Sequence, residues 1–151
     1  MKLVFLFINN QNKNDMTKRF LVTIGIMGAI SVLMGAVGAH ILEDNISDKY
    51  LNMFNTANEF LMYHALALIG LTAMNRNVSR SYLNTIYYLF VIGIILFSGT
   101  LYITSLTELT GFSLGLSGTL TPIGGILLII GWIAVIISGL TYKHKKRHSE
   151  H

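Results

Sequence analysis

The 151-residue chain contains no cysteine, a single proline and few charged residues. The absence of cysteine excludes disulfides, thiolate metal sites, a catalytic thiol and palmitoylation. Charged residues make up 12% of the chain, about half of the roughly 25% that is usual in soluble domains. Hydrophobic residues make up 52%, and many of the fourteen glycines lie inside apolar runs. This composition is typical of an integral membrane protein.

Four apolar segments are long enough to cross a bilayer core of about 30 Å, which takes about 20 helical residues. They cover approximately residues 20–42, 57–74, 82–106 and 120–142. Backbone groups in hydrocarbon must be paired within their own segment, so these runs are predicted to be helical despite their many β-branched residues. The predicted fold is therefore all-α, an integral membrane four-helix bundle.

The charges that flank these segments predict their orientation. Basic residues occur before the first segment, between the second and third, and after the fourth: Lys13, Lys18, Arg19, Arg76, Arg80, Lys143, Lys145, Lys146 and Arg147. The other two loops contain one lysine between them, Lys49. Because basic flanks stay in the cytoplasm, both termini are predicted to be cytoplasmic. The basic tail over 143–151 then lies near anionic headgroups, and no nucleic-acid partner is expected because no aromatic residues accompany these charges in a binding motif.

Three segments outside the spans carry their own predictions. Residues 1–19 form a cytoplasmic extension whose apolar run is too short for a span or a signal peptide, and Met16 is an alternative start. Residues 45–58 carry apolar side chains at helical spacing, which predicts a short interfacial helix before the second span. Residues 108–121 form a surface loop or hairpin, with Pro122 at or near the first turn of the last helix.

With this orientation, most polar residues of the spans fall in the outer half of the membrane. The candidate polar cluster consists of His40, Glu59, Tyr63, His64, Ser98, Thr100, Tyr102 and Thr121. Ionisable residues within a membrane should face the bundle interior and have a partner. Glu59, His64, His40 and Tyr102 are therefore expected to converge. A hydrogen-bond network that fixes helix packing is the favoured interpretation, and a ligand pocket, proton relay or metal site is the alternative.

The motifs of common catalytic and cofactor sites do not occur. Two histidines and a glutamate could ligate zinc, but they come from two helices without a tight ligand motif, so no metal is predicted. No dinucleotide-binding, phosphate-binding or serine-nucleophile motif occurs either, and no cofactor is expected. An enzyme is disfavoured because no nucleophile and base lie at a useful spacing.

Small residues repeat along the first and fourth segments. The helix-packing candidates are Gly28, Gly35, Gly38, Ala39, Gly124 and Gly131. Small side chains let helix backbones approach closely in a membrane. Packing within one chain suffices to explain them, and a homo-oligomer is the alternative.

Several motifs together resemble a known family. They are the runs at 34–40 (MGAVGAH), 59–68 (EFLMYHALAL), 97–102 (FSGTLY) and 120–125 (LTPIGG), followed by the pair at 131–132. Their order and spacing resemble the small bacterial membrane proteins catalogued as domain of unknown function 423, related to transmembrane protein 256 of animals. The resemblance covers residues 16–142 and implies a four-span plasma-membrane protein of bacteria without an assigned activity.

Some residues of this chain match the family motifs, and others depart from them. His40, His64, Ser98, Tyr102 and Pro122 fall on matching motif positions. The family pattern usually has glutamine or a similar residue ahead of the Tyr-His pair, and a small or aromatic residue at 37. No role for residue 59 is therefore taken from the family.

These observations predict a multi-pass plasma-membrane protein whose partner is the lipid bilayer and whose role is structural or accessory and non-enzymatic. The alternative is a small transporter or ligand-binding protein with a polar site in the outer half of the bundle, its ligand unspecified.

Overall fold

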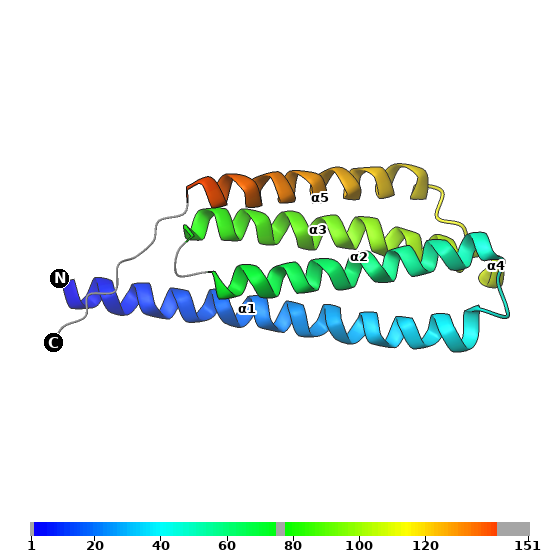
Figure 1. The fold of residues 1–151 in the computed structure, drawn as a ribbon, viewed down its shortest axis with the longest axis horizontal. Coiled ribbons are helices and arrows are strands. Elements are labelled where there is room, and N and C mark those ends of the chain that lie inside the picture. The colour runs from blue at the N-terminus through cyan, green and yellow to red at the C-terminus, as the bar shows by residue number, and fades with distance from the viewer. Residues whose placement is uncertain (1, 75–77, 142–151) are drawn as a thin grey trace.

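The computed structural model describes residues 2–74 and 78–141, with side chains from Asp15 onward. Its elements are α1 (Lys2–Val37), the π-helical turn η1 (Gly38–Leu42), α2 (Asp48–Ala73), α3 (Arg80–Ser105), the short α4 (Thr107–Thr110) and α5 (Ser117–Leu140). The predicted all-helical fold is confirmed, and these residues contain no strand. Figure 1 shows the four long helices side by side, each running antiparallel to the next along the chain.

Three segments of the described chain are long and apolar enough to cross a membrane. They are Asp15–Leu42, Arg80–Ser105 and Ser117–Leu140. The 26-residue α2 is not among them, because its first half carries the charged and amide residues Asp48, Lys49, Asn52, Asn55, Asn58 and Glu59. These three segments suit a multi-pass membrane protein, while the fourth span and the orientation stay predictions.

The observed helices correct several predicted boundaries. α1 already begins at Lys2, so the expected N-terminal extension is part of a helix, which no proline interrupts. The interfacial helix expected over 45–58 is not a separate element. From residue 48 it continues into α2, because no glycine or proline occurs in that helix before Gly70. α5 begins at Ser117, which places Pro122 in its second turn instead of its first. The basic tail lies outside the described residues.

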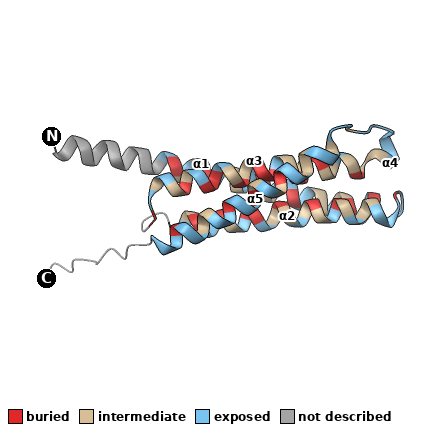
Figure 2. Ribbon diagram, turned by 90° about the horizontal axis from the view of Figure 1, so that it is seen from above, coloured by how far each residue is buried: buried red, intermediate tan, exposed pale blue. Residues whose placement is uncertain are grey.

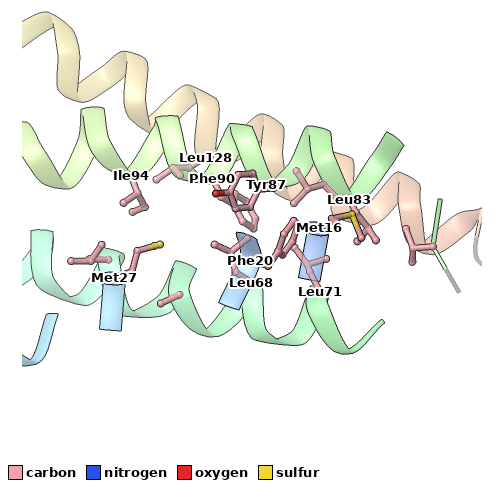
Figure 3. Packing of buried hydrophobic residues seen from close by; sticks show 14 residues of the cluster. Met16, Phe20, Met27, Leu68, Leu71, Leu83, Tyr87, Phe90, Ile94 and Leu128 are labelled. Atoms are coloured by element: carbon pink, nitrogen blue, oxygen red, sulfur yellow. The ribbon is translucent and has the colours of Figure 1, made fainter. Parts of the chain in front are cut away.

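The order of packing across the bundle is α1, α2, α3 and α5. α2 packs against both α1 and α3, and α5 packs against α3. Phe20, Leu68, Leu83 and Phe90 are almost fully buried where α1, α2 and α3 meet, and Leu128 of α5 joins this core (Figure 3). In Figure 2, buried residues line the inward faces of the helices and exposed residues the outward ones.

The outward faces are as apolar as the core. Along α5 the exposed side chains are Ile126, Ile129, Ile130, Trp132, Ile133, Ile136, Ile137 and Leu140. A soluble helix would place polar residues on this face. No other described element covers this apolar face, an arrangement that suits contact with lipid.

The predicted small-residue positions divide into two groups. On α5, a Cβ at Gly124 would lie 2.5 Å from the backbone nitrogen of Phe97, and one at Gly131 would lie 2.6 Å from the Phe90 ring. Both glycines therefore allow the close approach of α5 to α3.

On α1 and η1 only some of the small residues lie against a neighbouring helix. A Cβ at Gly35 would lie 3.3 Å from Asn58 Nδ2, and one at Gly38 would lie 3.3 Å from the Phe54 ring. Gly28 has nothing within 4 Å, and Ala39 is exposed. The α5 glycines and the second half of the α1 seam thus serve packing within the chain.

Candidate functional site

Asn58 of α2 is the centre of a hydrogen-bond network that joins three helices. The Tyr102 hydroxyl of α3 donates to Asn58 Oδ1 at 2.8 Å. Ser31 of α1, which is buried, donates to the same oxygen at 2.9 Å and also lies 3.3 Å from the backbone carbonyl oxygen of Asn58. Gly35 leaves the space beside the Asn58 amide nitrogen. One side-chain oxygen therefore ties α1 and α3 to α2.

His64 is another polar residue of α2 and is buried, with 4% of its surface exposed. The indole Nε1 of Trp132 on α5 donates to His64 Nε2 at 3.3 Å, and His64 Nδ1 lies 2.8 Å from the carbonyl oxygen of Phe60. An indole N–H only donates and a carbonyl only accepts. Nε2 is therefore the acceptor and Nδ1 carries the proton, so both nitrogens of a neutral imidazole are engaged.

Aromatic rings surround this imidazole. The Phe90 ring of α3 meets it edge-on at a centroid distance of 4.9 Å, and the Trp132 ring lies at 6.0 Å. Phe60 lies one turn away on α2, at 6.1 Å. An apolar cavity of about 170 Å³ adjoins the pair Phe90 and Trp132 and continues along α2 past Ala67. These apolar surroundings favour a neutral ring over an ionised one.

A third polar group lies between α3 and α5. Thr100 and Thr121 share a hydrogen bond of 2.7 Å between their hydroxyls, and Thr100 also donates to the backbone carbonyl of Leu96. The hydroxyl of Ser98 is buried and has no partner among the described residues. A groove of about 330 Å³ lies beside Thr121, and its other lining residues are Met53, Leu101, Thr104, Ser117, Gly118 and Pro122.

The predicted cluster is not a single site. His40, Glu59 and Tyr63 are exposed on the outside of the bundle, whereas His64 and Tyr102 are engaged with separate partners. The expected convergence of His40, Glu59, His64 and Tyr102 is therefore wrong. Glu59 and Tyr63 do share a face of α2, but it is the outward one. The two histidines and the glutamate considered as zinc ligands are equally kept apart.

Three residues of the network were missed by the sequence analysis: Ser31, Asn58 and Trp132. For Asn58 a signal existed. The buried residues of α2 recur at helical spacing, at Ala57, Leu61, His64, Ala65, Leu68 and Leu71, and residue 58 lies beside this stripe. Ser31 and Trp132 gave no comparable signal, because their roles depend on which helices are neighbours.

Known proteins give the family of this chain. The family model described as "Protein of unknown function (DUF423)" matches residues 34–125. The UPF0382 membrane protein SAB0533 of Staphylococcus aureus is 44% identical over 117 residues, which cover 75% of this chain and 91% of that protein. The UPF0382 membrane protein YwdK of Bacillus subtilis is 39% identical over 122 residues, 78% of this chain and 95% of the relative.

A more distant relative is the UPF0382 inner membrane protein YgdD of Escherichia coli. It is 34% identical over 132 residues, which cover 86% of this chain and 96% of the relative. No solved structure matches the chain. The range 34–125 matched by the family model includes Asn58, His64 and Tyr102. The chain belongs to the DUF423 family and is a multi-pass membrane protein of the bacterial cytoplasmic membrane type.

Proposed function

We propose that all four long helices cross the membrane and that both termini are cytoplasmic. α2 supports the fourth crossing because it packs along both α1 and α3, two helices that qualify as spans. Its 26 residues give a helix of about 39 Å at 1.5 Å per residue. The basic residues Arg19 and Arg80 lie at the same end of the bundle, where they line one pocket, and this end would face the cytoplasm.

Single cysteines test this topology, because the natural chain has none. Asp44→Cys and Phe112→Cys lie at one end of the bundle and Ser81→Cys at the other, all at exposed positions. In intact spheroplasts, a membrane-impermeant maleimide should label the first two variants and leave the third unlabelled until the cells are lysed. The opposite pattern would reverse the orientation, and labelling of all three would refute the crossings.

For the role of the protein we propose a non-enzymatic, structural or accessory function in which the buried polar groups fix helix packing. The supporting observation is that these groups form hydrogen bonds with one another or with the backbone. Both ring nitrogens of His64 are engaged, by Trp132 and by the Phe60 carbonyl, and the Tyr102 hydroxyl donates to Asn58. A catalytic base or nucleophile needs a site that substrate atoms reach, and neither group offers one.

Stability and complementation, measured together, test this role. His64→Leu and Asn58→Leu should lower the unfolding temperature of the purified protein in detergent and reduce complementation of a deletion strain in parallel. Tyr63→Phe and Glu59→Gln are the matched controls, since they change exposed neighbours on the same helix. A His64→Leu protein that stays as stable as the natural one and still loses complementation would exclude a packing role.

The groove beside Thr121 favours a second function, a small transporter or ligand-binding protein. Its volume of about 330 Å³ lies at the lower end of the range for small-molecule sites, and Thr104 and Thr121 are among its lining residues. Thr104→Val is the informative variant, because the Thr104 hydroxyl donates only to its own helix, at the Thr100 carbonyl. If this variant keeps its stability but loses complementation, the ligand site is favoured over the packing role.

A further inference from the structure

At the end of the bundle where α3 begins, a polar pocket separate from the networks above lies between α1 and α3. Its volume is about 320 Å³, and its lining residues are Asp15, Met16, Arg19, Arg80 and Asn84. The lining thus contains two cationic side chains, one carboxylate and one amide. Its formal charge is positive even with Asp15 ionised, which favours an anionic ligand.

Arg19 is held firmly at the wall of this pocket. Its Nη1 donates to the Tyr88 hydroxyl at 3.0 Å and its Nη2 donates to Asn84 Oδ1 at 2.6 Å. Its guanidinium carbon lies 4.7 Å from the centre of the Tyr87 ring and 5.2 Å from that of Tyr88, within range of cation–π attraction. Tyr87 is fixed in turn by a hydroxyl contact of 2.7 Å with Thr23. The cation is therefore pre-organised and loses little freedom when it binds a ligand.

The donors of Arg19 and Asn84 are only partly used. A guanidinium has five N–H groups, and the two hydrogen bonds above use two of them. Its Nε is buried and has no partner among the described residues. Each of the two terminal nitrogens keeps one N–H that these hydrogen bonds do not use. Asn84 accepts through Oδ1, so its amide N–H groups remain donors. Guanidinium and amide donors around a positive pocket match the oxygens of a phosphate group.

The surroundings of the pocket favour a phosphate that belongs to a lipid. The uncharged stretch of α1 starts directly after Arg19, and the span in α3 starts at Arg80, so the pocket lies at the level of the headgroups. Along α1, Val22 and Ile26 follow Arg19 on the same helix face and are exposed; along α3, Ile92 follows Asn84 and Tyr88 in the same way. Exposed apolar surface thus runs from the pocket towards the membrane interior, where acyl chains would lie.

We propose that this pocket binds the phosphate group of an anionic phospholipid, with Arg19, Arg80 and Asn84 as its ligands. Basic pockets between transmembrane helices on the cytoplasmic side are suited to such headgroups. Inorganic phosphate shares the chemistry but lacks acyl chains, and a zwitterionic lipid shares the phosphate but lacks the net charge. Inorganic phosphate therefore tests the contribution of the acyl chains to binding, and the zwitterionic lipid tests the contribution of the net charge.

The test measures lipid binding to the full-length protein in detergent by native mass spectrometry. The probes are dioctanoyl phosphatidylglycerol, dioctanoyl phosphatidylcholine and inorganic phosphate. Arg80→Gln removes one cation of the pocket. Asn84→Asp keeps the oxygen that accepts from Arg19 but adds a negative charge to the pocket. Lys18→Gln is the matched control, because it removes one exposed cation beside the pocket that does not line it.

Phosphatidylglycerol should bind more tightly than phosphatidylcholine and resist displacement by inorganic phosphate. Arg80→Gln and Asn84→Asp should each weaken it by about tenfold or more, the effect of losing one hydrogen bond to a charged group, while Lys18→Gln leaves it within about twofold, as expected for a screened surface charge. Unchanged binding in both pocket variants would overturn the proposal, and so would an equal loss in the Lys18 variant. Displacement of the lipid by inorganic phosphate would assign the pocket to the free ion instead.

Discussion

Replacing Gly124 with alanine perturbs the contact between α3 and α5 where the two backbones are closest. The added Cβ would lie 2.5 Å from the Phe97 nitrogen, 2.8 Å from the Gly93 oxygen and 3.0 Å from the Leu96 carbonyl carbon. All three are backbone atoms, so no side chain can rotate away. At the next position the same change is harmless, because a Cβ at Gly125 would meet only the Phe97 ring, at 3.7 Å.

The expected magnitude follows from this difference. Ordinary contact begins at 3.4 Å, so the Cβ at 124 is about 0.9 Å too close and the helices must separate or shift. Overpacking of this kind costs about 1–3 kcal/mol, while alanine gains about 1 kcal/mol over glycine in helix propensity. Gly124→Ala should therefore be destabilised by up to about 2 kcal/mol net. Gly125→Ala, without the clash, should be stabilised by about 0.5–1 kcal/mol.

The assay uses the single tryptophan of the chain, Trp132, which is carried by α5 and hydrogen-bonded to His64 of α2. Unfolding in detergent, followed by tryptophan fluorescence, should show an earlier transition for Gly124→Ala than for the natural protein and a later one for Gly125→Ala. If the two variants shift the transition equally, or if Gly124→Ala stabilises the protein, the close approach of α5 to α3 is refuted.

Three further predictions concern the polar contacts. Asn58→Leu should cost about 1–3 kcal/mol, because it leaves the buried Ser31 hydroxyl and the half-buried Tyr102 hydroxyl without their acceptor, and equilibrium unfolding in detergent measures it. A double-mutant cycle of Thr100→Val and Thr121→Val should give a coupling of about 0.6 kcal/mol, the average for hydrogen bonds between membrane helices; zero coupling would exclude the bond. Glu108→Gln should speed amide hydrogen exchange at Ser47, whose N–H and hydroxyl donate to the Glu108 carboxylate at 2.7 and 3.0 Å; unchanged exchange would contradict that contact.

The helical class and the membrane location could be predicted because they depend on local properties. Length and apolar composition fix the three strongest spans, and backbone pairing in hydrocarbon then requires helices. The ends of the elements were less predictable. Apolar spacing over 45–58 predicted a separate interfacial helix, whereas this segment from residue 48 onward belongs to the same helix as the span. The structure runs unbroken from Asp48 to Ala73.

The site was predicted less well than the fold for a physical reason. In a soluble helix the apolar face points inward, but in a membrane both the lipid-facing and the inward face are apolar. The spacing of Glu59 and Tyr63 shows that they share a face without showing which face is buried. Polarity suggested that His40, Glu59, His64 and Tyr102 all face inward, whereas the structure buries His64, leaves His40 and Glu59 exposed and pairs Tyr102 with Asn58. Pairs such as His64 and Trp132 depend on the order of the helices, which no local pattern contains.

Two independent features fix the rotation of α5 against the bundle. Gly124 and Gly131 must both face α3, since a Cβ at either position would meet α3 atoms at 2.6 Å or less. Trp132 follows Gly131 directly and must at the same time reach past Phe90 to His64. Turning α5 by one residue, about 100°, would break the glycine contact and the hydrogen bond together. A polar bond between α2 and α5 and a glycine seam between α3 and α5 therefore select the same helix register.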